Sequence, residues 1–164
     1  MAAVRLQNNA TGDGEYARPV GSDAAGVVAA IRAKDRCADA LGIMVLDAGA
    51  GTATVEMTVR ADMCNGHDTC HGGIIFTLAD SAMGFASNSH GVEALATAAS
   101  VEFLQPARDG DVIRATATER HLYGRSGVYD VAVTRDDGTA IALFRGKTLH
   151  IGAVHFAASS TVSS

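Results

Sequence analysis

The chain has 164 residues, of which 48% are hydrophobic and 19% charged, and its formal net charge is −5 at pH 7. This composition is globular, and the length suits one domain with a sizeable core. The mildly acidic balance excludes a sequence-independent nucleic-acid binder, because such a protein needs a basic surface. No apolar run approaches the roughly 20 residues of a membrane span, and three cysteines without framework spacing fit a reducing cytoplasm.

The two ends of the chain differ in composition from its middle. Residues 1–22 mix Gly, Asn, Ala and Thr without periodicity, and they hold no apolar segment typical of a signal peptide. Residues 153–164 are mostly small and polar. We therefore expect a flexible leader, one domain over residues 23–152 and a flexible tail.

The first part of the domain predicts a helix followed by two strands. The Ser-Asp pair at 22–23 offers an N-cap for a helix that runs to about Ala40. Residues 43–46 are typical of a short strand and 47–51 of a turn. Residues 52–60 alternate between apolar and polar side chains, which predicts an antiparallel strand with one buried face.

After a loop over residues 61–70 the sequence becomes almost wholly apolar. Gly72–Ser89 has no proline and predicts a helix that is buried on most sides. Four strand-like runs follow, separated by the turn-forming clusters PARDGD, YGRS and RDDG: residues 94–104, 111–122, 127–135 and 139–149. This order predicts an α+β fold in which a curved antiparallel sheet wraps around the long helix and hides it.

Asp80 is a carboxylate in the middle of this apolar helix. It is the only formally charged residue between Asp68 and Glu93. Burying an ionised carboxylate without partners costs several kcal/mol. Either Asp80 pairs with an arginine or with hydroxyl groups and serves packing, or it is kept partly desolvated as a base or nucleophile.

The start of the same helix offers a second chemical group. Gly72 and Gly73 lie where the first helical N–H groups are unpaired and where the helix dipole adds partial positive charge. Because glycine lets a ligand oxygen approach the backbone, this end can stabilise the oxyanion of an acyl transfer. A tight loop-to-helix turn is the plainer interpretation of the glycine pair.

The spacing of these two groups constrains how they act. Gly72 and Asp80 are eight residues apart, which corresponds to roughly 12 Å along a helix. One helix therefore cannot bring both groups to one carbonyl carbon. If they act together, a second copy of the chain supplies one of them, and two antiparallel helices across a two-fold axis give two equivalent sites per dimer.

The segment NGHDTCHGGIIFTLADSAMGFASNSHG, residues 65–91, resembles the signature of hotdog-fold acyl-CoA thioesterases of the PaaI type, which is associated with phenylacetate degradation. The resemblance extends over residues 38–152 and includes FLQPARDGD, GRSGVYDV and ALFRGKT. It implies one helix in a curved sheet, a homodimer with a continuous sheet and often a homotetramer. It also implies hydrolysis of an acyl-CoA to acid and CoA, with no cofactor beyond the CoA of the substrate.

The resemblance assigns roles to four residues of the segment. Asp80 is implied to act as nucleophile or as base for water, and the Gly72 N–H as the oxyanion donor. His71 is implied to position the thioester or its sulfur. Asn65 is implied to place the attacking water or the carboxylate.

The resemblance also places the substrate. Thr97 or Ser100, on the strand after the helix, is expected to supply a hydroxyl near Asp80. Residues near the dimer seam are expected to contact the CoA phosphates: Arg125, Ser126, Gly127, Arg145 and Lys147. The apolar stretches IIF and MGF predict a pocket for aryl or medium-chain acyl groups, and the resemblance alone favours hydroxylated phenylacetyl-CoA.

Other interpretations use the same residues. Cys64, His67, Cys70 and His71 are four potential metal ligands within eight residues, but they lack the paired spacing of a zinc site, so we expect no metal. Cys70 beside His71 is a poor nucleophile pair, because adjacent residues of an extended segment point in opposite directions.

The alternative function is a non-catalytic acyl-CoA-binding or regulatory protein on the same fold. A hotdog dehydratase fits less well, since that family sets its catalytic histidine against a carboxylate in a different pattern. Asp80 favours the hydrolase, because binding alone has no need of a carboxylate inside an apolar helix.

Overall fold

The computed structural model describes residues 23–153, so the predicted leader over 1–22 and residues 154–164 of the predicted tail lie outside the described residues. Ala153, where the tail was expected to begin, still belongs to the last strand. The elements in chain order are helices α1 (Ala24–Arg32) and α2 (Arg36–Leu41), strands β1 (Met44–Gly49) and β2 (Thr52–Thr58), the 3-10 turn η1 (Ala61–Met63), helix α3 (Gly72–Asn88), and strands β3 (Val92–Phe103), β4 (Val112–Tyr123), β5 (Ser126–Arg135) and β6 (Ala140–Ala153).

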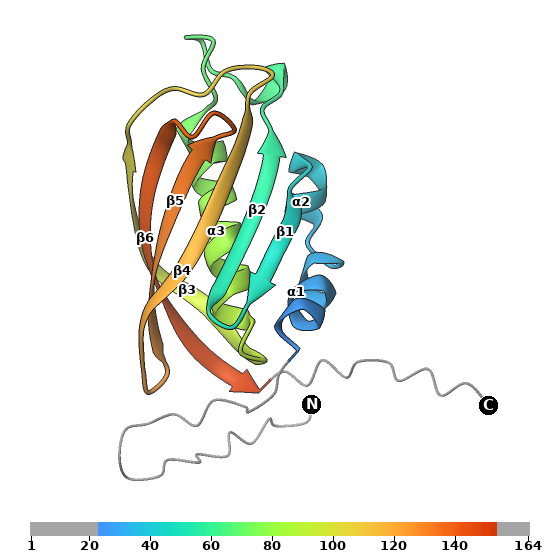
Figure 1. The fold of residues 1–164 in the computed structure, drawn as a ribbon, viewed down its shortest axis with the longest axis vertical. Coiled ribbons are helices and arrows are strands. Elements are labelled where there is room, and N and C mark those ends of the chain that lie inside the picture. Colours follow the sequence, from blue (N-terminus) through green and yellow to red (C-terminus); the bar gives the residue numbers. More distant parts are fainter. Residues whose placement is uncertain (1–22, 154–164) are drawn as a thin grey trace, which may run out of the picture.

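The six strands form one antiparallel sheet in the order β1-β2-β4-β5-β6-β3. The sheet curves around α3, and α1 and α2 lie beside β1 (Figure 1). This is the predicted α+β architecture with a long helix wrapped by a curved antiparallel sheet, and it is a hotdog fold. Among the described residues, no helix is both long and apolar enough to cross a membrane.

Helix α3 is buried against the concave face of the sheet, as its composition predicts. Five of its apolar side chains are fully buried: Leu78, Ala79, Ala82, Met83 and Ala86. They pack against the alternating apolar face of β2, where Ala53, Val55 and Met57 are at most 1% exposed. One stripe of α3 remains half-exposed, and its members recur at helical spacing on one side: Thr77, Asp80, Ser81 and Gly84.

The prediction of one helix from residues 22–23 to about Ala40 is wrong. Asp23 does cap α1, since its Oδ1 accepts a hydrogen bond from the Gly26 N–H over 3.0 Å. Asp35 then caps a second helix, α2, by accepting from the Ala38 N–H over 2.9 Å. A second N-cap side chain in the middle of the apolar pattern ends the first helix there, because the cap residue takes an extended backbone conformation.

The first strand is longer than predicted and the following turn is shorter. Residues 47–49, which were expected in the turn, belong to β1. A register shift between Val45 and Asp47 disturbs the alternation that would have marked the strand in the sequence. The turn is confined to residues 50–51, where Gly51 takes a positive φ of 74°.

Strand β3 lies at one edge of the sheet and pairs only with β6 within the described residues. Every residue from 95 to 100 is exposed. Large apolar side chains cluster at its two ends, where Leu95 is 55%, Phe103 52% and Leu104 49% exposed. A long apolar edge strand is a surface that natural proteins usually cover.

Candidate active site

Helix α3 begins with a histidine cap that leaves one backbone donor free. The Nδ1 atom of His71 accepts a hydrogen bond from the Gly73 N–H over 3.1 Å, so a neutral His71 ring carries its proton on Nε2. The Gly72 N–H makes no hydrogen bond within residues 23–153. This free N–H, at the positive end of the helix dipole, has the chemistry of an oxyanion donor.

Phe103 lies over this helix start, a feature that we did not predict. A Cβ atom at Gly72 would lie 2.9 Å from the Phe103 Cζ atom, which is closer than real Cβ contacts. Glycine at this position therefore allows the aromatic ring to approach the backbone. The available signal was the motif FLQPARDGD, which Phe103 begins.

Asp80 lies in the middle of α3 on its half-exposed stripe. Burial raises the pKa of the Asp80 carboxyl above its ordinary value. The carboxylate has no hydrogen-bond or ion-pair partner within residues 23–153, so the described chain does not supply the arginine or hydroxyl partner of the packing interpretation. A partly desolvated, unpartnered carboxylate is suited to act as a base or nucleophile.

The two groups do not meet within one chain. Gly72 and Asp80 belong to one continuous helix of 17 residues, and their eight-residue spacing corresponds to about 12 Å along its axis. A carbonyl oxygen on the Gly72 N–H is therefore out of reach of the carboxylate of the same chain.

Asn65 is held in the loop that leads to α3. Its Oδ1 accepts hydrogen bonds from the His67 N–H over 2.9 Å and from the Thr69 hydroxyl over 3.2 Å. Its backbone N–H also donates to the Thr69 carbonyl over 2.8 Å. The loop thus uses the amide oxygen, while the Nδ2 group makes no hydrogen bond within residues 23–153 and remains available as a donor.

Neither of the two predicted hydroxyl residues forms a hydrogen bond with Asp80 within residues 23–153. The pairing of β3 with β6 shifts register between residues 96 and 98, and Thr97 lies at this irregularity. The Thr97 hydroxyl donates to the Lys147 carbonyl over 3.3 Å. Ser100 pairs with Arg145, and its neighbour Val101 packs into the core. Since side chains alternate along a strand, Ser100 lies on the face opposite α3.

The residues predicted to contact CoA phosphates are not one cluster of free cations. Arg145 forms a two-point ion pair with Asp130, with Nε–Oδ1 2.6 Å and Nη2–Oδ2 2.9 Å. Arg125, Ser126 and Lys147 are exposed, whereas Gly127 is buried. The contact of these residues with CoA phosphates stays a prediction.

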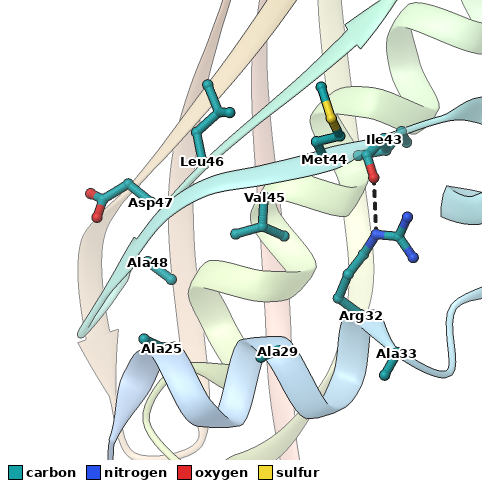
Figure 2. Close-up of a pocket in the computed structure, with 10 residues that line it drawn as sticks. All are labelled: Ala25, Ala29, Arg32, Ala33, Ile43, Met44, Val45, Leu46, Asp47 and Ala48. Carbon is teal, nitrogen blue, oxygen red and sulfur yellow. Dashed lines mark hydrogen bonds between the residues drawn. The ribbon is translucent and has the colours of Figure 1, made fainter.

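Two other features of the described residues bear on the choice of active site, the potential metal ligands and a groove beside α1. Within the described part of the chain, no three His, Cys, Asp or Glu residues are placed to hold a metal ion. A groove of about 620 Å³ lies between α1 and β1, at the sheet edge opposite β3. Figure 2 shows the side chains that line it. Arg32 stands at one end, where its Nε donates to the Ile43 carbonyl over 2.9 Å. No residue predicted for the active site lines this groove.

Comparisons with known proteins converge on one family. A family model described as the thioesterase superfamily matches residues 67–142. The acyl-coenzyme A thioesterase PaaI of Escherichia coli (strain K12) is 48% identical over 118 residues, which cover 72% of this chain and 84% of that protein.

Solved structures give the same result. The structure of E. coli PaaI, a protein of the phenylacetic acid degradation operon, has a TM-score of 0.79 at 44% identity and covers 80% of this chain and 95% of that one. The TT0310 protein of Thermus thermophilus has a TM-score of 0.69 at 38% identity, over 72% of this chain and 99% of that one. A Streptococcus mutans protein bound to acetyl CoA has a TM-score of 0.66 at 26% identity, over 68% of this chain and 90% of that one.

The raised pKa of Asp80 predicts a pH-dependent stability difference. Between the usual Asp value of about 4 and the raised folded value, the unfolded chain loses the proton first, so the free energy of unfolding falls as pH rises. We expect Asp80→Asn to match the wild type near pH 3 and to gain thermal stability relative to it towards pH 7. Melting curves by circular dichroism across this range are the measurement. A stability difference that stays constant with pH would contradict this electrostatic environment.

Proposed function

The chain belongs to the thioesterase superfamily, and we propose that it is an acyl-CoA thioesterase that hydrolyses an aryl- or medium-chain acyl-CoA to a free acid and CoA. The observation that carries this proposal is Asp80, a carboxylate that has no hydrogen-bond or ion-pair partner within residues 23–153 and lies on the half-exposed stripe of α3. The identity to E. coli PaaI supports the activity. The acetyl CoA bound to the S. mutans relative supports a CoA ester as ligand.

The proposed reaction begins with the thioester carbonyl oxygen on the Gly72 N–H. The Asp80 carboxylate attacks the carbonyl carbon or takes a proton from the water that does so, and the Gly72 N–H stabilises the negative charge that forms on oxygen. The C–S bond then breaks. In the water route the proton that Asp80 took passes to the CoA sulfur and the free acid forms directly. In the nucleophilic route a water molecule hydrolyses the acyl–Asp80 anhydride to the free acid and supplies the proton of the CoA thiol. The Nε2–H of His71 is the donor for the thioester sulfur, and Asn65 Nδ2 is the donor that places the water or carboxylate. No cofactor is required.

The two central groups come from different chains in this proposal. The roughly 12 Å between Gly72 and Asp80 on one helix requires a partner helix in the opposite direction. Among residues 23–153 no strand pairs with the outer edge of β3, where Leu95 and Phe103 are exposed. This edge supports a homodimer in which two copies pair their β3 strands into one sheet. A homotetramer built from two such dimers is the larger assembly that we propose.

The acyl group is proposed from the side chains around α3. Ile74 and Phe76 are half-buried at the start of the helix, and the Phe76 ring lies edge-on to Phe144 with ring centroids 5.2 Å apart. Such apolar surroundings favour aryl and medium-chain acyl groups over polar ones. The operon of E. coli PaaI makes hydroxylated phenylacetyl-CoA the first substrate to assay.

A non-catalytic acyl-CoA-binding protein is the alternative on the same fold. It predicts that the chain binds acyl-CoA esters and releases no CoA from any of them. A panel of acyl-CoA esters separates the two functions. Because the chain has three cysteines, CoA release is best followed by chromatography instead of a thiol-reactive dye.

Asp80→Asn is expected to lower turnover by at least about 100-fold, the usual scale for losing a base or nucleophile. The substitution keeps the size of the side chain, so the fold should persist. Asp39→Asn is the matched control, because Asp39 is an exposed carboxylate on α2. Near-wild-type turnover of Asp80→Asn would exclude Asp80 as the catalytic group.

Gly72→Pro removes the proposed oxyanion donor with little disturbance of the helix. Proline is well tolerated at the first helical position, and His71 already has φ −61° and ψ 133°, which suit a residue before proline. Gly72→Ala adds a Cβ against Phe103 but keeps the N–H, so it is the steric control. We expect Gly72→Pro to turn over about 100-fold or more slowly than Gly72→Ala. Equal rates would show that the N–H is not used.

A further inference from the structure

Cys64 and Cys70 lie directly opposite each other in an isolated antiparallel β-bridge. The bridge is flanked by two hydrogen bonds, from the His71 N–H to the Met63 carbonyl and from the Asn65 N–H to the Thr69 carbonyl, both 2.8 Å long. This pattern makes the cysteines a non-hydrogen-bonded pair, whose Cα atoms lie about 4.5 Å apart with side chains close together. Disulfides span Cα separations of about 4.4 to 6.8 Å. The register therefore brings the two thiols within bonding reach.

The two thiols differ in their access to solvent. Both are free in this structure, and Cys64 is half-exposed whereas Cys70 is 5% exposed. Burial, together with the nearby Cys64, raises the pKa of the Cys70 thiol to about 11. An oxidant from solution therefore meets Cys64 first, and Cys70, of which only a small fraction is thiolate at neutral pH, closes the disulfide in a slower second step.

We propose that Cys64 and Cys70 form a reversible disulfide that controls the active site, with a small soluble disulfide as the oxidant. The Cys64 thiolate attacks one sulfur of the oxidant, which forms a mixed disulfide and releases one thiol. The Cys70 thiolate then attacks the Cys64 sulfur, closes the protein disulfide and releases the second thiol. The two protein thiols are oxidised, the oxidant is reduced, and the two thiol protons end on the two released thiols.

The position of this pair connects it to the reaction. The bond would close the loop 65–69, which carries Asn65, and it would lie immediately before His71 and the start of α3. At present Cys64 Sγ lies 3.7 Å from the Arg60 carbonyl and Cys70 Sγ lies 3.8 Å from the His71 carbonyl. Both side chains must turn towards each other, and Cys70 leaves its packing in the core. Oxidation therefore shifts the neighbours of both cysteines and lowers turnover.

The test uses the full chain equilibrated in oxidised or reduced glutathione, blocked with an alkylating reagent and digested with trypsin. The tryptic peptide 61–108 contains Cys64 and Cys70 but not Cys37. After oxidation, this peptide should escape alkylation and lose the mass of two hydrogen atoms. Turnover should fall, by up to about 100-fold for a misplacement of about 1 Å at the active site, and should return on reduction.

Two variants isolate the effect. Cys64→Ser should keep basal turnover and lose its sensitivity to oxidised glutathione. Cys37→Ser, which removes the exposed cysteine of α2, should stay as sensitive as the wild type. The proposal is overturned if both thiols remain open to alkylation in the oxidising buffer, if only a mixed disulfide with glutathione forms, or if the closed disulfide leaves turnover unchanged.

The effect on turnover rests on the proposed thioesterase activity, whereas the disulfide does not. Failure of the proposed function would appear as absent turnover in the reduced wild type, with the mass change of peptide 61–108 still measurable. Failure of the redox proposal would appear as an active enzyme that does not respond to oxidation.

Discussion

The fixed rise per residue along the axis of α3 is the constraint on which the proposed active site depends. Within the described part of the chain, Gly72 offers an unpaired N–H at the start of the helix and Asp80 an unpartnered carboxylate in its middle, with about 12 Å between them. Because a helix cannot shorten, the groups serve one thioester only if a second chain aligns its helix in the opposite direction. In such a dimer, the half-exposed stripe of α3 faces the partner's helix, and the apolar edge of β3, unpaired within the described residues, pairs with the partner's β3.

Much of the fold could be predicted because the hydrophobic periodicity and the turn-forming residues indicate the same elements from β2 onwards. The alternation of β2, the proline-free apolar run of α3 and the turn clusters between the later strands all gave the right elements. The elements before β2 were predicted less well, because a local feature of the chain interrupted the hydrophobic pattern at two places. Asp35 capped a new helix inside a continuous apolar pattern, and the register shift after Val45 hid the length of β1.

Only those features of the site that follow from a residue's position along α3 could be predicted from the sequence. Placing Gly72 at the first turn and Asp80 in the middle needs nothing beyond the bounds of α3. The pairing of Cys64 with Cys70 depends on loop hydrogen bonds that no sequence period encodes. The side of the sheet on which Ser100 lies depends on the register shift at residues 96–98, and that shift has no mark in the sequence.

The central claim is that one active site uses Gly72 of one chain and Asp80 of the other, and mixed dimers test it directly. Asp80→Asn and Gly72→Pro chains are co-expressed with different tags, and the mixed dimer is isolated by two successive affinity steps. One of its sites then has both native groups and the other has both lesions. The account predicts about half the wild-type turnover per dimer, from one working site of two, while each parent homodimer stays nearly inactive. A purified mixed dimer as inactive as its parents would contradict the shared site.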